Sequence, residues 1–257
     1  MYKSKSYRVR SLEDVCIDIE TLAHNYPRAN KIFLADGDAL SLPTEHLLTL
    51  LKELQNSFPR LSRVSTYASA QNILNKSKEE LEALSQNRLN LFYYGIETGS
   101  DVLLKKITKG VTQEEIITSL NRASDSGVKI SATVILGIGG ERYSSIHVQE
   151  TAKLINAVKI NYLSTLQLGL EEDAEDNFYR HFKDFSALDD YQIVAEQKRF
   201  IELLNPSNRV IFRSNHVSNA LHLAGTLPKD RERLIKELNI ALQTGENTFV
   251  PNRLRGF

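Results

Sequence analysis

Short apolar stretches alternate with amphipathic stretches along almost the whole chain, and this alternation limits the possible folds more than any other feature. In the amphipathic stretches, apolar residues recur every three to four positions, which is typical of helices. Strands that alternate with helices form mainly parallel sheets. The sequence therefore predicts an α/β fold, with strands expected at 31–35, 63–67, 89–95, 129–136, 162–168 and 209–213.

Signals for helix ends fit this division. Ser11 and Ser77 each stand three residues before an acidic residue, which is the spacing of a capping box. Gly127 ends the helical pattern that begins near residue 112, because glycine readily adopts the left-handed conformation after a last helical turn. Residues 171–190 are more polar, and we expect an extended loop or a small insertion there.

Length and composition favour one domain over residues 1–257, with a helical extension from about residue 220. Lys plus Arg and Asp plus Glu each number 32, so the net charge is zero and does not indicate a nucleic-acid partner. No apolar stretch approaches the roughly 18 residues of a membrane span. We expect a cytoplasmic protein with no membrane partner.

Glycines and acidic residues follow three of the predicted strands. Asp36, Gly37 and Asp38 follow the strand at 31–35, Glu97 lies in Gly-Ile-Glu-Thr-Gly-Ser at 95–100, and Gly-Ile-Gly-Gly-Glu occupies 137–141. The carboxyl ends of parallel strands meet at one edge, where binding groups collect. A plainer reading is structural, because Asp and Gly favour turns and Ser100 can cap the next helix.

These motifs resemble those of the radical S-adenosylmethionine (radical SAM) superfamily, in its elongator-like and methylthiotransferase-like branch. The turn Leu-Ala-Asp-Gly-Asp-Ala-Leu at 34–40 is similar to that of an uncharacterised subgroup. The resemblance implies a partial (β/α)6 barrel of the TIM type and S-adenosylmethionine as cofactor. It assigns the methionyl end to Asp36, Gly37 and Asp38, the ribose to Glu97, and the adenine side to Gly137, Gly139, Glu141 and Leu166. Glu141 is expected to fix its loop by binding backbone N–H groups.

Cys16 is the sole cysteine. The family holds a [4Fe–4S] cluster on three closely spaced cysteines near the N-terminus, and iron–sulfur clusters need thiolate ligands. Residues 2–10 resemble the stretch that follows the last of those cysteines. We therefore expect an N-terminally truncated chain that lacks the first strand and the cluster loop. The cluster is expected only in the full-length form, and the unpaired sheet edge favours a homo-oligomer.

A polar stretch after the last predicted strand contains candidate substrate ligands, namely Arg213, Asn215, His216 and Asn219. Helix capping by Ser214 or Asn215 explains the same stretch equally well. His24, His46 and His147 lie in helical patterns without ligand spacing between them, and we expect no protein metal site.

The favoured hypothesis is an enzyme whose intact form cleaves S-adenosylmethionine reductively and abstracts hydrogen from an unidentified substrate. The chain as given is expected to be inactive. One alternative is a cluster-free barrel that binds S-adenosylmethionine or a nucleoside, or acts as a scaffold. Another is a metal-dependent barrel hydrolase or lyase that uses Asp36, Asp38, Glu97 and Glu141.

Overall fold

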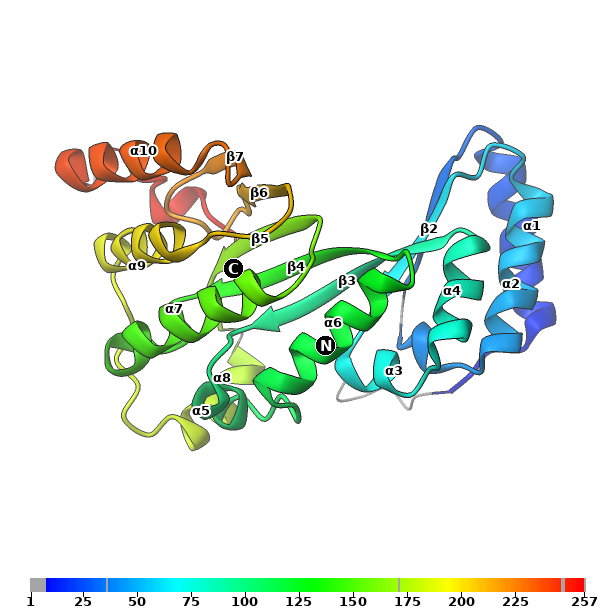
Figure 1. The fold of residues 1–257 in the computed structure, drawn as a ribbon, viewed down its shortest axis with the longest axis horizontal. Helices are drawn as coiled ribbons and strands as arrows, with labels where there is room; N and C mark the ends of the chain where they lie inside the picture. The colour runs from blue at the N-terminus through cyan, green and yellow to red at the C-terminus, as the bar shows by residue number, and fades with distance from the viewer. Residues whose placement is uncertain (1–7, 36, 171, 246–247, 257) are drawn as a thin grey trace. The chain divides into compact units, whose positions relative to one another are not determined.

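The computed structural model describes residues 8–35, 37–170, 172–245 and 248–256, and the chain folds as two compact units. The first unit comprises Met1–Tyr93 and Arg122–Lys129, and the second comprises Tyr94–Asn121 and Ile130–Phe257. β3 (Leu89–Glu97) and α6 (Gln113–Asp125) each contribute residues to both, and β4 (Lys129–Leu136) contributes only its first residue to the first unit. Figure 1 shows the order of the elements along the chain.

The first unit is a parallel sheet with helices. Its other elements are α1 (Leu12–Asn25), β1 (Lys31–Leu34), η1 (Ala39–Ser41), α2 (Thr44–Ser57), β2 (Arg63–Tyr67), α3 (Ala70–Leu74) and α4 (Lys78–Gln86). β1 pairs with β2, and β2 pairs with β3, both in parallel. The stripe Leu47, Leu51 and Leu54 of α2 is buried, as expected for the apolar face of an amphipathic helix.

Helix ends in this unit follow the sequence signals. The side chain of Ser11 accepts a hydrogen bond from the N–H of Asp14. Ser77 and Glu80 form a reciprocal capping box at the start of α4. Gly127, with φ +80°, lies two residues after the end of α6 in a left-handed conformation that glycine adopts more easily than other residues. The predicted helix boundaries at these three places are confirmed.

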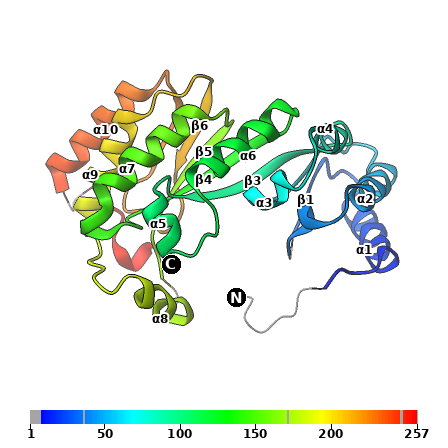
Figure 2. The same cartoon turned by 60° about the horizontal axis from the view of Figure 1, so that its bottom comes forward.

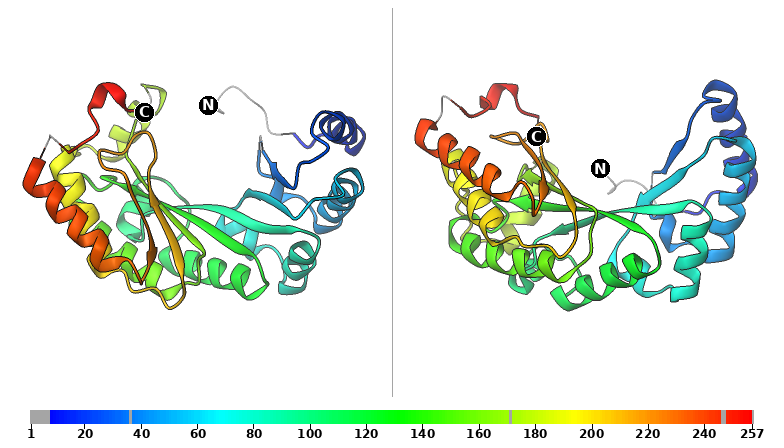
Figure 3. Two further views of the ribbon diagram at one scale, coloured as in Figure 1. Left: turned by 90° about the horizontal axis from the view of Figure 1, so that it is seen from above. Right: turned by 45° about the horizontal axis from the view of Figure 1, so that its top comes forward.

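The second unit contains the remaining strands. It comprises α5 (Asp101–Lys106), β4 (Lys129–Leu136), α7 (Gly140–Ala157), β5 (Tyr162–Gln167), α8 (Glu172–His181), α9 (Asp190–Leu203), β6 (Val210–Ser214), β7 (Leu223–Leu227), α10 (Arg231–Thr244) and η3 (Asn252–Leu254). β4, β5 and β6 are parallel neighbours, and β7 is antiparallel to β6. Helix α9 lies between α7 and α10 (Figures 2 and 3).

Burial alternates along β4. Ile130, Ala132, Val134 and Leu136 are buried, whereas the residues between them remain partly accessible. Successive side chains of a strand point to opposite faces, so one face of β4 is packed and the other is more open. The open face and the strand ends are the places where this unit can present polar groups.

Two stretches differ from expectation. Residues 171–190 contain α8 rather than only a loop. Phe182, directly after α8, is buried with Leu103 and Ile138, and Phe178 and Phe185 of the same stretch pack against this cluster. The aromatic side chains thus give this polar stretch an apolar face. The region after residue 220 begins with β7, and its helix α10 starts only at Arg231. Pairing with β6 turns the short Leu-Ala-Gly-Thr-Leu segment into a strand, although its own β-propensity is modest. None of the helices in the described part of the chain is long and apolar enough to cross a membrane.

Candidate functional site

In the first unit, the acidic turn follows β1. Asp36 lies outside the described residues. The carboxylate of Asp38 accepts a hydrogen bond from the side-chain amide of Asn72 at 3.0 Å. Asn72 is buried and itself closes the capping box of α3 with Ser69. The start of α3 therefore orients Asp38, which lines a cavity of about 140 Å³ together with Gly37.

In the second unit, Glu97 ends β3 in a conformation that non-glycine residues rarely adopt, with φ +61°. Its carboxylate is 3.0 Å from the ammonium group of Lys109, and its side chain is 21% exposed. The carboxylate lies over Gly95, where a Cβ would come within 2.1 Å of it. Strained backbone of this kind persists where surrounding contacts determine it, and it is frequent at functional sites.

Buried contacts fix the turn that follows Glu97. The N–H of Gly99 donates to the hydroxyl of Thr151 at 2.8 Å, and Gln113 donates to the carbonyl of Gly99 at 2.7 Å. The Nδ1 atom of His147 lies 2.9 Å from the hydroxyl of Thr98. Burial lowers the pKa of His147 to about 4, so this histidine is neutral at neutral pH. It is a packed residue of α7 that braces the turn.

The glycine-rich loop that joins β4 to α7 packs closely against its own chain. A Cβ on Gly137 (φ +78°) would lie 2.6 Å from Ile193, and one on Gly140 (φ +53°) would lie 2.5 Å from the carbonyl oxygen of Ser186. At Gly139 the nearest atom would be the carbonyl carbon of Tyr143, at 2.8 Å. The chain's own packing therefore requires glycine in this loop.

The carboxylate that binds a backbone N–H of this loop is Glu196, at 2.6 Å from the nitrogen of Gly137. Glu141, expected in this role, accepts from the side-chain amide of Gln192 instead, at 3.3 Å. The expectation failed because Glu141 lies in the first turn of α7 and is exposed. Glu196 is buried on α9, where its carboxylate reaches the loop. Glu196 lies on the buried face of α9 together with Ile193 and Phe200. A carboxylate in that otherwise apolar pattern is the sequence feature that could have indicated a buried role.

At the carboxyl end of β5, Leu166 is half-buried and lies opposite Ile135 of β4. Asn219, after β6, is 2% exposed and ties these strand ends together. Its amide nitrogen donates to the carbonyl of Thr165 at 2.8 Å and to the hydroxyl of Ser214 at 2.9 Å. Both amide hydrogens of Asn219 are thus taken by the protein.

The other candidate substrate ligands are exposed. Arg213 donates to the carbonyl of Phe212 at 2.8 Å, and His216 contacts the hydroxyl of Ser218 at 2.8 Å. Asn215 lies between them in the sequence and is also exposed. Arg213 lies near the carboxyl end of β6, and Asn215 and His216 follow that strand. They lie on the same side of the unit as the end of β5, since the two strands run parallel.

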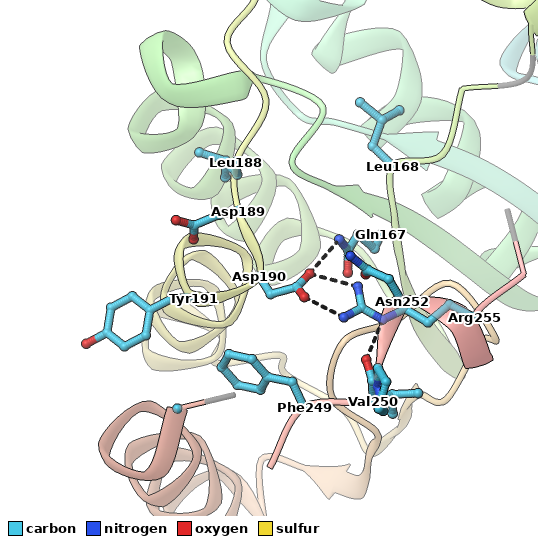
Figure 4. Close-up of a pocket in the computed structure, with 12 residues that line it drawn as sticks. Gln167, Leu168, Leu188, Asp189, Asp190, Tyr191, Phe249, Val250, Asn252 and Arg255 are labelled. Atoms are coloured by element: carbon cyan, nitrogen blue, oxygen red, sulfur yellow. Dashed lines mark hydrogen bonds and ion pairs between the residues drawn. The ribbon is translucent and has the colours of Figure 1, made fainter. Parts of the chain in front are cut away.

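A cavity of about 990 Å³ opens beside the end of β5 (Figure 4). Gln167, the start of α9 and the C-terminal segment 249–255 line it. The guanidinium of Arg255, 1% exposed, forms a two-pronged ion pair with the carboxylate of Asp190, with one nitrogen–oxygen distance of 2.7 Å. These hydrogen bonds lower the pKa of Asp190. Nothing in the sequence pattern singled out Arg255, because its partner lies 65 residues away.

A parallel α/β fold with acidic residues and a glycine-rich turn at its strand ends defines a class of proteins that bind ligands at that edge. A sequence model described as the radical SAM superfamily matches residues 2–155. The chain therefore belongs to the radical SAM superfamily.

Curated relatives agree with this assignment. The heme chaperone HemW of Bacillus subtilis is 30% identical over 142 residues, which are 54% of this chain and 38% of HemW. A putative methylthiotransferase of Methanocaldococcus jannaschii is 28% identical over 141 residues, 51% of this chain and 30% of that protein. The matched part thus spans about a third of the length of these relatives.

Solved structures share the fold. Coproporphyrinogen III oxidase (HemN) of Escherichia coli, a radical SAM enzyme, matches with a TM-score of 0.56 and 16% identity over 74% of this chain and 44% of that chain. The archaeal Elp3 of Methanocaldococcus infernus matches with a TM-score of 0.56 and 12% identity over 90% of this chain and 58% of that chain. The predicted α/β fold of the partial TIM-barrel type is confirmed.

Family membership implies S-adenosylmethionine and a [4Fe–4S] cluster as cofactors. The strand-end carboxylate of Glu97 fits a ligand with hydroxyl groups, because it is fixed in place and partly accessible. The cluster does not fit the residues present, since its thiolate ligands outnumber the single Cys16, which lies half-buried on α1. In the described residues, no three side chains of His, Cys, Asp or Glu gather as a metal site requires.

Proposed function

We propose that this chain is the S-adenosylmethionine-binding part of a radical SAM enzyme. The observation that carries the proposal is Glu97, a partly accessible carboxylate at the end of β3 that is held in a left-handed conformation and oriented by Lys109. A carboxylate at a strand mouth can accept hydrogen bonds from both hydroxyls of a ribose. Family membership makes the nucleoside of S-adenosylmethionine the natural ligand.

Further residues of the second unit complete an adenosine site in this proposal. The loop from Gly137 to Glu141 borders the adenine, and Leu166 offers an apolar contact at the end of β5. Bound there, S-adenosylmethionine would supply the radical chemistry of the family. The chain's own residues orient the cofactor and exclude water.

The thiolates of the cluster come, in this proposal, from cysteines outside the sequence given. The chain alone then binds the cofactor without cleaving it. The exposed polar groups of Arg213, Asn215 and His216 are proposed to contact the substrate. Asn219 is left out, because its amide hydrogens already serve the protein.

Binding of S-adenosylhomocysteine, measured by isothermal titration calorimetry, tests the proposal without any cluster. We expect the wild-type chain to bind, and Glu97→Ala to weaken binding by about tenfold or more, because hydrogen bonds to a charged acceptor are lost. Glu237→Ala is the matched control. It removes another ion-paired carboxylate, which lies on α10 against Arg233.

A wild-type chain that does not bind S-adenosylhomocysteine would refute the proposal. Equal affinity of the wild type and Glu97→Ala would remove Glu97 from the site. A loss of affinity in Glu237→Ala as large as that in Glu97→Ala would show that the effect is not specific to the strand end.

The single cysteine also favours a second candidate, a barrel that binds S-adenosylmethionine and never carries a cluster. Both candidates bind S-adenosylhomocysteine. They differ in the genomic reading frame upstream of Met1, where the enzyme hypothesis expects three closely spaced cysteine codons and the binding-protein hypothesis expects none.

A further inference from the structure

Glu196 is a carboxylate on α9 with no accessible surface. A buried carboxylate is costly unless hydrogen bonds satisfy it, so its partners indicate what it does. It lies in the middle of α9, a helix whose other buried residues are mostly apolar. Its hydrogen-bond donors are Gly137, directly after β4, and Ser144, in α7.

One donor from each side of the glycine-rich loop binds this carboxylate. The N–H of Gly137, directly after β4, donates to Oε1 at 2.6 Å. The hydroxyl of Ser144, in α7, donates to Oε2 at 2.5 Å. Arg199, one turn further along α9, donates to the hydroxyl of Ser144 at 3.1 Å and brings a positive charge near the carboxylate. Glu196 thus connects both sides of the glycine-rich loop to α9.

The backbone of the loop depends on this connection. Gly137 has φ +78°, and its N–H is turned toward Glu196 of α9, where Ile193 occupies the space that a Cβ on Gly137 would need. Without the carboxylate, this buried N–H would have no partner, and an unsatisfied buried donor destabilises the conformation that exposes it. We propose that Glu196 is a positioning residue that fixes the Gly137–Gly140 loop for binding the adenosine of S-adenosylmethionine.

This inference rests on the proposed function, since it assigns Glu196 to the same cofactor site. Glu196 itself need not touch the cofactor, because it is fully buried between the loop and α9. It acts by keeping the loop in one conformation before the ligand arrives, and preorganisation of this kind raises affinity without a new contact.

The test compares Glu196→Ala with Gln197→Ala in the full chain. Gln197 is the adjacent buried polar residue on α9, and its amide donates to Thr165 at 3.1 Å without touching the loop. Both variants therefore lose a buried hydrogen bond from the same helix. We measure the affinity for S-adenosylhomocysteine by calorimetry and the amide hydrogen exchange of residues 137–143 by mass spectrometry.

We expect Glu196→Ala to lose about tenfold or more in affinity and to exchange the loop amides faster. Gln197→Ala should stay within about twofold of the wild type in affinity, with an unchanged loop. Glu196→Gln keeps an oxygen that can accept from Gly137, so it should retain most of the affinity. That rescue separates loop positioning from general loss of stability.

The inference is overturned if Glu196→Ala binds like the wild type, or if Gln197→Ala loses as much affinity as Glu196→Ala. If Glu196→Ala does not fold, Ser144→Ala takes its place, and unchanged affinity and exchange in that variant overturn the inference. If the wild type itself does not bind, the proposed function fails, while loop exchange that rises only in Glu196→Ala still supports the positioning of the loop.

Discussion

Buried polar side chains hold each strand-end turn of the second unit. His147 braces Thr98 after β3, Glu196 holds Gly137 after β4, and Asn219 joins the ends of β5 and β6. Buried polar groups are stable only when they are hydrogen-bonded, and here their partners are the turns themselves. Buried residues that need not contact the ligand therefore fix the turns of the candidate site.

His147 makes the stability of the protein depend on pH. Burial lowers its pKa to about 4 in the folded chain, whereas an unfolded chain has the ordinary value near 6.5. Between pH 6.5 and pH 4, this histidine is mostly protonated in the unfolded chain and mostly neutral in the folded chain. The free energy of unfolding therefore falls as the pH drops toward 4. Between pH 7 and pH 4.5, urea unfolding should show a loss of roughly 2 to 3 kcal/mol from this residue.

His147→Gln, which keeps a polar group near Thr98, should lack this part of the pH dependence. His222→Gln removes an exposed histidine and should retain the wild-type dependence. Equal slopes of stability against pH in the wild type and His147→Gln would contradict the assignment.

At the scale of elements, the alternation of short apolar stretches with amphipathic stretches predicted the six strands from β1 to β6. It also placed Glu97 and the glycine-rich loop at strand ends, where the structure has them. It did not predict β7, whose strand conformation depends on pairing with β6. The role of Glu196 was not predicted. The helical pattern shows that this residue lies on the buried face of α9, but it does not show that its partner is Gly137, 59 residues away.

The C-terminal segment also depends on a distant partner. Arg255 binds Asp190 at the start of α9 and donates to the carbonyl of Val250 at 2.7 Å. Removing one partner of a buried ion pair leaves the other charge uncompensated and costs roughly 3 to 5 kcal/mol. Asp190 is 28% exposed, so we expect Arg255→Ala to cost less than about 3 kcal/mol and to release residues 248–256.

Hydrogen exchange measures that release directly. The amides of 248–256 should exchange much faster in Arg255→Ala, whereas Arg253→Ala, which truncates an exposed arginine of the same segment, should leave them protected. Slow exchange in both variants would mean that the ion pair does not hold the segment.

At the scale of the whole molecule, family membership implies a [4Fe–4S] cluster, whereas the residues present cannot supply its thiolate ligands. The family model covers residues 2–155, yet the chain carries one cysteine, and it spans only about a third of its curated relatives. The proposed function therefore separates cofactor binding from cluster binding. In that proposal, carboxylates and backbone groups of the second unit bind the cofactor, whereas a cluster needs thiolates that the sequence lacks.

Anaerobic reconstitution with iron and sulfide, followed by desalting and iron analysis, tests that separation. We expect far fewer than about four iron atoms per chain, because one thiolate cannot replace the cysteine ligands of a [4Fe–4S] cluster. Cys16→Ala is the control, since several chains could share a cluster if each supplied Cys16. Iron that stays stoichiometric in the wild type and disappears in Cys16→Ala would show such sharing. Binding of S-adenosylhomocysteine by the same iron-free preparation would show that the nucleoside site forms without the cluster.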